Sequence, residues 1–267
     1  MKKNLLRSLL LLAAGALPFM TPVRAVPAAA STPFAAQIVA DADKGRNPGT
    51  PFRLTNTIIE YVDGRPRSSV RLAVYAKEDP TSHQYRNLVQ YVAPQRDAGK
   101  TVLLDGSRMW FYDPESKASV RISQQQRLLG QASNGDAVTV NLARDYRPTL
   151  AGAEEVKDAD GKSRHCWHLS LVAATADAVY SRMEYWTEQS TAYSVKAKYY
   201  SDSDRLLKTV YFRNYQPRLN GQRPTEVVIL DGVDKSLVTT MSYSDYREVA
   251  IPDSWFQRDF LPKFRAD

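Results

Sequence analysis

The chain of 267 residues has a formal net charge of +7, 43% hydrophobic residues and one cysteine. A single cysteine excludes an internal disulfide, so packing must stabilise the fold. Loss of the N-terminal Lys2, Lys3, Arg7 and Arg24 would lower the net charge to +3, which is too small to indicate a nucleic-acid partner.

Residues 1–25 have the pattern of a cleavable signal peptide. A basic start precedes a short apolar run, and Val23-Arg24-Ala25 places small residues before a cut at Val26. The run is too short to cross a bilayer comfortably, and no other apolar stretch of about 18 residues follows it. Because the residue after the cut is not a cysteine, we expect export without a lipid anchor.

A linker and a folded part follow. Residues 26–33 are mostly small residues and prolines, which predict a disordered tether. Residues 34–267 are expected to form one domain, because their number suits a single all-β sandwich or barrel and no second boundary is visible. At the start of this domain, residues 34–44 predict a helix with Phe34 and Ile38 on one stripe.

From residue 54 onward, apolar and polar residues alternate, which is typical of strands with one apolar face. Turn dipeptides such as Asp63-Gly64 and Asp105-Gly106 separate the alternating segments and favour tight hairpins. The scarcity of helix between them favours an antiparallel sheet over βαβ units. The predicted strands are 54–62, 67–76, 85–92, 100–104, 108–112, 118–122, 150–157, 163–172, 181–188, 193–201, 206–214, 224–231 and 236–246.

One segment breaks the alternation. Residues 123–130 predict a helix that Ser123 caps and Gly130 ends, and Asp136 is a candidate cap for a second short helix. Together with the helix over 34–44, these helices near 123–142 are expected to cover one face of the sheet.

No recognisable catalytic motif occurs in the sequence, such as a nucleophile elbow or a phosphate-binding loop. Its one metal-like cluster is His165-Cys166-Trp167-His168, in which only Cys166 and His168 share a strand face. Two ligands are too few for a structural zinc site. We therefore expect no metal, no cofactor and no enzymatic activity.

A sheet of about a dozen strands tends to curl, and an apolar concave face that is not filled forms a groove. The alternative is that the apolar faces pack against one another and against the helices. A one-residue register error would turn any set of wall residues outward. The predicted groove wall consists of Leu72, Val74, Trp167, Leu169, Leu171, Val195, Val210 and Phe212, with Trp110 and Tyr112 as additions.

Four segments resemble the signature block of the outer-membrane lipoprotein-sorting proteins, the LolA-like group, and the similarity extends over residues 34–260. Where relatives often carry a GSDFSYED-like segment, this chain differs, with GQASNGD at 130–136. The four segments are Tyr85–Pro94, Gly99–Leu104, Met109–Pro114 and Arg121–Ser123. Further matches are Asp136, Tyr146, Tyr185-Trp186, Leu207-Lys208-Thr209, Ile251-Pro252 and Phe256.

The resemblance implies a mainly β fold with a few helices (α+β), a half-open antiparallel β-barrel whose concave face is covered by helices. It also implies a soluble periplasmic carrier of a Gram-negative cell, which binds lipid or lipoprotein acyl chains. An RND-type transporter or an outer-membrane acceptor is the implied partner, and we expect a monomer. The alternative is a sensor of the same fold, which reads envelope lipid or misfolded lipoprotein and signals to a membrane partner.

Overall fold

The computed structural model describes residues 33–265 of the chain. The predicted signal peptide and residues 26–32 of the predicted tether lie outside this range. None of the described helices is long and apolar enough to span a membrane. The elements in chain order are α1 (Pro33–Arg46), β1 (Phe52–Val62), β2 (Arg65–Glu78), β3 (Tyr85–Ala93), η1 (Gln95–Asp97), β4 (Thr101–Asp105), β5 (Arg108–Asp113), β6 (Ala118–Ile122), β7 (Arg127–Leu129), β8 (Ala132–Ser133), η2 (Asn134–Asp136), α2 (Leu142–Asp145), β9 (Tyr146–Lys157), β10 (Ser163–Ala173), β11 (Arg182–Glu188), β12 (Ser194–Tyr200), β13 (Leu206–Arg218), β14 (Gly221–Asp231), β15 (Leu237–Glu248), η3 (Asp253–Phe256) and η4 (Arg258–Lys263).

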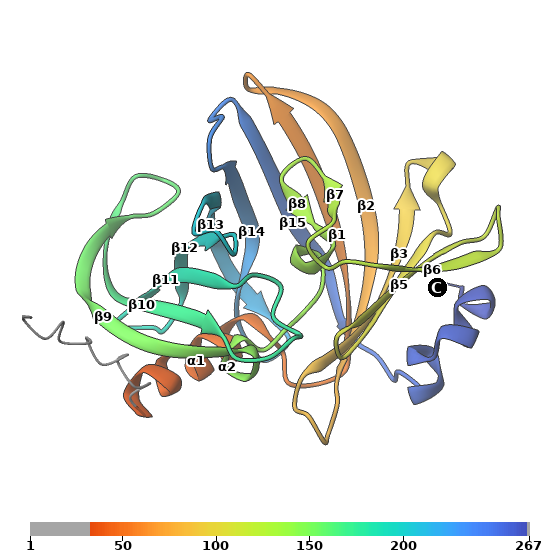
Figure 1. The fold of residues 1–267 in the computed structure, drawn as a ribbon, viewed down its shortest axis with the longest axis horizontal. Helices are drawn as coiled ribbons and strands as arrows, with labels where there is room; N and C mark the ends of the chain where they lie inside the picture. Colours follow the sequence, from red (N-terminus) through yellow and green to blue (C-terminus); the bar gives the residue numbers. More distant parts are fainter. Residues whose placement is uncertain (1–32, 266–267) are drawn as a thin grey trace, which may run out of the picture.

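One antiparallel sheet of 13 strands dominates the described residues, in the order β6-β5-β4-β3-β2-β1-β15-β14-β13-β12-β11-β10-β9. Because β6 and β9 stand at the two ends of this order, the sheet is open. It curls around a concave face, with β9–β12 in one wing and β3–β6 in the other (Figure 1). The mainly β, half-open antiparallel fold that the sequence predicts is confirmed.

Each of the predicted strand segments forms a strand of this sheet. The prediction succeeds because it uses two local signals, the alternation of apolar residues and the turn dipeptides. At Asp63-Gly64 both residues have positive φ, 50° and 72°, and they join β1 to β2 in a two-residue turn. Right-handed strand twist favours such turns, and Asp-Gly adopts them readily. The largest differences in a boundary are at β9, which begins at Tyr146 rather than at residue 150, and at β13, which ends at Arg218 rather than at residue 214.

The predicted helix over residues 34–44 is also confirmed, and it covers part of the concave face as α1 (Figure 1). Ile38 and Val39 of α1 are buried in the main core. The ring of Phe34 meets that of Trp167 edge to face, with centroids 5.4 Å apart. The apolar stripe of the helix therefore packs on the apolar face of the β9–β12 wing.

The predicted helices near 123–142 are wrong over most of their length. The chain forms the hairpin β7–β8 there, then the short η2, and only residues 142–145 are α-helical. The backbone carbonyl of Gln124 accepts a hydrogen bond from the amide of Gly135, and the carbonyl of Gln126 accepts one from the amide of Asn134. Residues 124–126 are therefore bonded to residues 134–135 and not to one another in a helix. These cross-segment bonds override the local helix propensity. Asp136 is the third residue of a capping box closed by Ser133, not the cap itself.

The convex face of the β3–β5 wing is covered by the C-terminal segment, residues 249–264, which the sequence analysis does not predict. Tyr75 of β2 packs edge to face on Trp255 and Phe264, with centroids 5.5 and 5.4 Å apart. Lys77 anchors the segment by donating to Asp253 at 2.8 Å. As a result, β2 is buried on both of its faces.

Gly130 links β7 to β8 and is the position at which we expect a methyl group to be least tolerated in this hairpin. Its φ is +55°, and an added Cβ would lie 2.3 Å from Thr239 Oγ1. We predict that Gly130→Ala lowers the free energy of unfolding by more than about 1 kcal/mol, measured by urea denaturation. Gly106→Ala is the control, because Gly106 has φ +58° with nothing within 4 Å of the added Cβ. Equal losses in the two variants would contradict the predicted clash.

Candidate functional site

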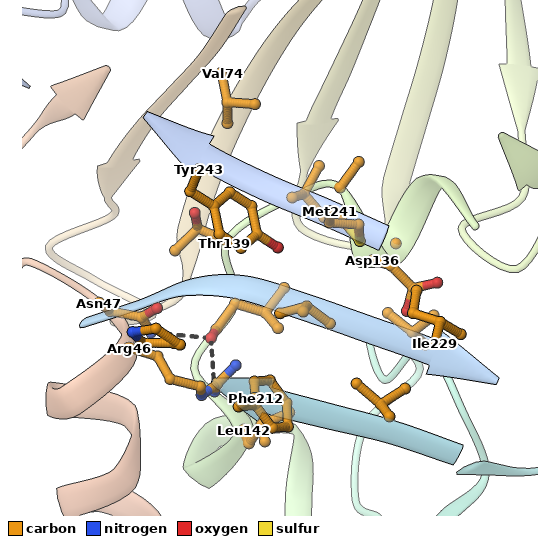
Figure 2. A pocket seen from close by; sticks show the side chains of 18 of the residues that line it. Arg46, Asn47, Val74, Asp136, Thr139, Leu142, Phe212, Ile229, Met241 and Tyr243 are labelled. Atoms are coloured by element: carbon orange, nitrogen blue, oxygen red, sulfur yellow. Dashed lines mark hydrogen bonds between the residues drawn. The ribbon is translucent and has the colours of Figure 1, made fainter. Parts of the chain in front are cut away.

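A cavity of about 140 Å³ lies between the concave face of the sheet and the segment that precedes β9 (Figure 2). The sheet contributes apolar side chains from β1, β2 and β13–β15, because alternate residues of each strand point inward. The apolar wall residues on these strands are Phe52, Leu54, Val74, Val210, Phe212, Pro224, Val227, Ile229 and Met241, and Tyr243 and Tyr246 of β15 line the cavity with them.

The other side of the cavity is residues 137–143, which we call the lid. Two amide side chains of the β3 region hold it in the manner of a β-ladder. Asn87 donates to the Thr139 carbonyl and accepts from the Thr139 amide, both at 2.8 Å. Gln84 makes the equivalent pair with Asn141, at 3.2 and 2.7 Å. The lid is thus fixed largely by hydrogen bonds to its backbone.

The end of α1 secures the lid at one end of the cavity. Asn47 donates to the Val140 carbonyl at 3.0 Å, and Arg46 reaches the same carbonyl at 3.5 Å (Figure 2). Asp43 pairs with Arg46 and accepts from the Ala143 amide at 2.8 Å. Burial raises the pKa of Asp43 from its ordinary value, while the Arg46 guanidinium opposes this shift.

At the other end of the cavity a buried ion pair joins Asp136 to Lys208. Asp136 also accepts from the backbone amide and the hydroxyl of Ser133, at 2.7 and 2.9 Å, and from the Tyr180 hydroxyl at 3.1 Å. Lys208 is only 4% exposed, and desolvation lowers its pKa while Asp136 opposes the shift. Four polar groups therefore converge on one carboxylate beside the apolar side chains of the sheet.

Asp145 is a second buried carboxyl on the cavity wall, at the end of the short α2. The Thr175 hydroxyl donates to it at 3.5 Å, and the Gln84 side chain also donates to it. Burial is the main reason that its pKa rises to about 6. The group therefore titrates in a range where an exposed aspartate is already ionised.

Only part of the predicted groove wall lines this cavity. Val74, Val210 and Phe212 do. The other predicted residues of the concave face belong to or pack against the main core, so the alternative of simple packing describes them. Three of them lie on β10 in the wing that α1 covers, whereas Leu72 lies on β2. These residues are Leu72, Trp167, Leu169 and Leu171.

Three of the predicted wall residues point to the opposite face. Trp110 and Tyr112 pack on the C-terminal segment at the convex face. Their neighbours on β5, Met109 and Phe111, face the concave side and pack in the main core. Val195 is the extra residue of a bulge, since Trp186 pairs with Lys196 while Thr187 pairs with Ser194. It therefore packs with Cys166 on the convex side.

Several residues that line the cavity are absent from the predicted groove wall. Ile229 and Met241 lie on predicted strands, and extending the alternation analysis to those strands would have identified them. Asp136 and Lys208 are separated by 72 residues, so no local pattern pairs them. Both residues are among the matches to the lipoprotein-sorting group. That resemblance is the one signal in the sequence that marks the two residues together.

The residues of the metal-like cluster at 165–168 take part in packing and in ion pairs on β10. Cys166 is buried, and burial raises its pKa to about 12. His168 lies between two carboxylates, with Nδ1 3.1 Å from Glu154 and Nε2 2.6 Å from Glu184. Within residues 33–265, no group of three or more histidine, cysteine or acidic side chains is placed to hold a metal ion.

The buried ion pair can be tested by a double-mutant cycle. We predict that Lys208→Met lowers the free energy of unfolding by about 3–5 kcal/mol, because Asp136 stays buried without its counter-ion. Asp136→Asn leaves Lys208 unpaired and should also destabilise. The double variant should lose less than the sum of the two single losses. Urea unfolding of the four proteins measures this, and strictly additive losses would contradict a coupled pair.

Asp145 should make stability depend on pH. Because its folded-state pKa is about 6 against an ordinary 3.8, the folded protein binds more protons between these values, and stability falls as pH rises through them. We predict that Asp145→Asn matches the wild type near pH 4 and exceeds it above pH 6, by up to about 3 kcal/mol. Denaturant unfolding across pH checks this, with the exposed Asp202→Asn as control. A difference that does not vary with pH would refute the assignment.

Comparison with known proteins gives the family. A model of a family described as an uncharacterized protein matches residues 83–263, which is more than half of the chain. No curated protein matches the sequence. A LolA superfamily protein from Nitrosomonas europaea has 29% identity and a TM-score of 0.75, over 85% of this chain and 98% of that one.

Two more distant structures share the fold. A DUF1329 family protein from Desulfovibrio piger has 20% identity and a TM-score of 0.73, over 87% of this chain and 99% of that one. A proposed outer membrane lipoprotein-sorting protein domain from Vibrio parahaemolyticus has 17% identity and a TM-score of 0.71, over 86% and 98%. These two matches show the fold alone. The family model over residues 83–263 and the relative from Nitrosomonas europaea show that the chain belongs to a LolA-like family.

Proposed function

We propose that the protein is a soluble periplasmic carrier, which binds an acyl chain of a lipid or of a lipid-modified protein in the concave cavity. The observation that carries the proposal is the apolar cavity enclosed between the sheet and the lid. The LolA-like fold supports it, since one structural relative is described as a lipoprotein-sorting domain. No catalytic step is involved, because the ligand is moved and not altered.

The physical need for such a carrier is large. Exposure of an acyl chain to water costs about 0.8 kcal/mol for each methylene, so about 15 methylenes cost on the order of 12 kcal/mol. A cavity that buries the chain removes most of this cost during transit. Release then requires a partner that stabilises the open lid or offers a better site for the chain.

The size of the cavity implies that the lid moves when ligand binds. An apolar cavity of about 150 Å³ accommodates a molecule the size of benzene, and the observed volume is about 140 Å³. A full acyl chain therefore needs additional space. The lid is the segment best suited to provide it, because water can replace the hydrogen bonds from Asn87 and Gln84 when the segment lifts.

A carrier of this kind needs membrane partners that load it and unload it. An RND-type transporter or an outer-membrane acceptor would supply or receive the chain, after export directed by residues 1–25. The sensor remains the alternative prediction. A transfer assay between donor and acceptor vesicles separates the two, since a carrier accelerates lipid transfer whereas a sensor binds lipid without accelerating it.

Filling the cavity should abolish binding. We predict that Val210→Trp, at a wall position that is 4% exposed, reduces the lipid that co-purifies with the periplasmic protein at least fivefold. Lipid extraction and native mass spectrometry measure this. Val172→Trp is the matched control, because Val172 is 49% exposed on β10 and lines no part of the cavity. Unchanged lipid content in folded Val210→Trp would refute the cavity as the binding site.

A further inference from the structure

A second cavity, of about 330 Å³, lies beside the first. It is enclosed by the β7–β8 hairpin on one side and by the loops before β13 and after β14 on the other. Tyr180 lines both cavities, and the Lys208–Asp136 pair contributes Lys208 to this one and Asp136 to the apolar one. The ion pair therefore stands between an apolar compartment and a polar compartment.

The lining of the second cavity carries more positive than negative charge. Arg127 and Arg205 both line it and are exposed, and neither guanidinium has a hydrogen-bond or ion-pair partner among residues 33–265. The charge of Lys208 is neutralised by Asp136. The one acid of the lining, Asp231, keeps its negative charge, although its Oδ1 accepts from the backbone amides of Val233 at 2.8 Å and Asp234 at 2.9 Å. The two arginines therefore leave the lining with an excess of positive charge.

We propose that this second cavity binds the anionic headgroup, a phosphate or carboxylate, of the lipid whose chain occupies the apolar cavity. The inference rests on the proposed function, because it gives the same ligand a second contact. Arginine suits the role, since its planar fork of donors matches the oxygens of phosphate and carboxylate. Two unpaired guanidinium groups reject a cationic headgroup by the same electrostatics.

The position of the cavity fits an amphiphile. Val233 at its edge is 80% exposed, so an apolar side chain already stands beside the charged opening. A chain that enters past Tyr180 would leave its headgroup beside Arg127 and Arg205. The ligand class is thus a single-chain or multi-chain lipid with a negatively charged head, rather than a neutral or cationic one.

Decanol and decyl phosphate test the proposal, because they share one tail and differ in the head. We expect the wild type to bind decyl phosphate about tenfold more tightly than decanol in isothermal titration. In Arg127→Gln/Arg205→Gln this preference should fall to near one, while decanol binding is unchanged. Arg71→Gln/Arg247→Gln removes the same charge from exposed positions outside both cavities and should keep the preference.

The contrary outcomes separate the two proposals. Equal binding of both probes by the wild type would overturn the headgroup site and leave the carrier intact. Failure to bind either probe would overturn both. Inorganic phosphate is the third probe, and if it bound as tightly as decyl phosphate, the cavity would be a free-anion site and not a headgroup site. Loss of the preference in Arg71→Gln/Arg247→Gln would show that overall charge, and not this cavity, is responsible.

Discussion

Coverage of the concave face is the constraint on which the rest of the structure depends. Thirteen strands curl without closing, so inward side chains such as Val74, Ile229 and Met241 would face water unless something lies over them. Each 100 Å² of apolar surface left in water costs about 2.5 kcal/mol. The fold meets this constraint in two physically different ways, by apolar packing under α1 and by a hydrogen-bonded lid beside it.

Under α1 the coverage is by close apolar packing. Leu169 and Leu171 are fully buried, and the helix presents Ile38 and Val39 to the same core. Under the lid it is incomplete, because a segment whose backbone is bonded to Asn87 and Gln84 cannot fill the concavity as closely as apolar side chains do. The cavity lies where the hydrogen-bonded lid, and not the apolar stripe of α1, covers the sheet. A cover held by polar contacts is also one that water can help to open.

Asp136 and Lys208 stand between the cavity under the lid and the cavity beside the β7–β8 hairpin. A charge pair with little access to solvent is costly to maintain and is poor evidence of stability alone, so its position is informative. It lies at the boundary between an apolar volume and one lined by unpaired arginines. An amphiphile requires this kind of division, with the chain on one side and the head on the other.

The sequence predicts the sheet well because strand alternation and turn chemistry are local. Alternation identified every strand of the large sheet, and the apolar stripe of residues 34–44 identified α1. Local pattern failed at residues 123–142, where bonds from Gln124 and Gln126 to the 134–135 backbone replace a helix. Local pattern also placed Trp110, Tyr112 and Val195 on the wrong face of the sheet. On β5, alternation alone does not say which of the two sets of residues faces the concave side, and on β12 a bulge turns Val195 to the convex side.

The sequence by itself determined the antiparallel architecture, its turns and the supply of apolar side chains for a concave face. Tertiary structure alone decided which of those side chains remain unpacked. The wall of the cavity is assembled from strands far apart in the chain, and Asp136 meets Lys208 across 72 residues. Such meetings depend on the curl of the whole sheet and on the lid bonded across it, and no short stretch of sequence contains either.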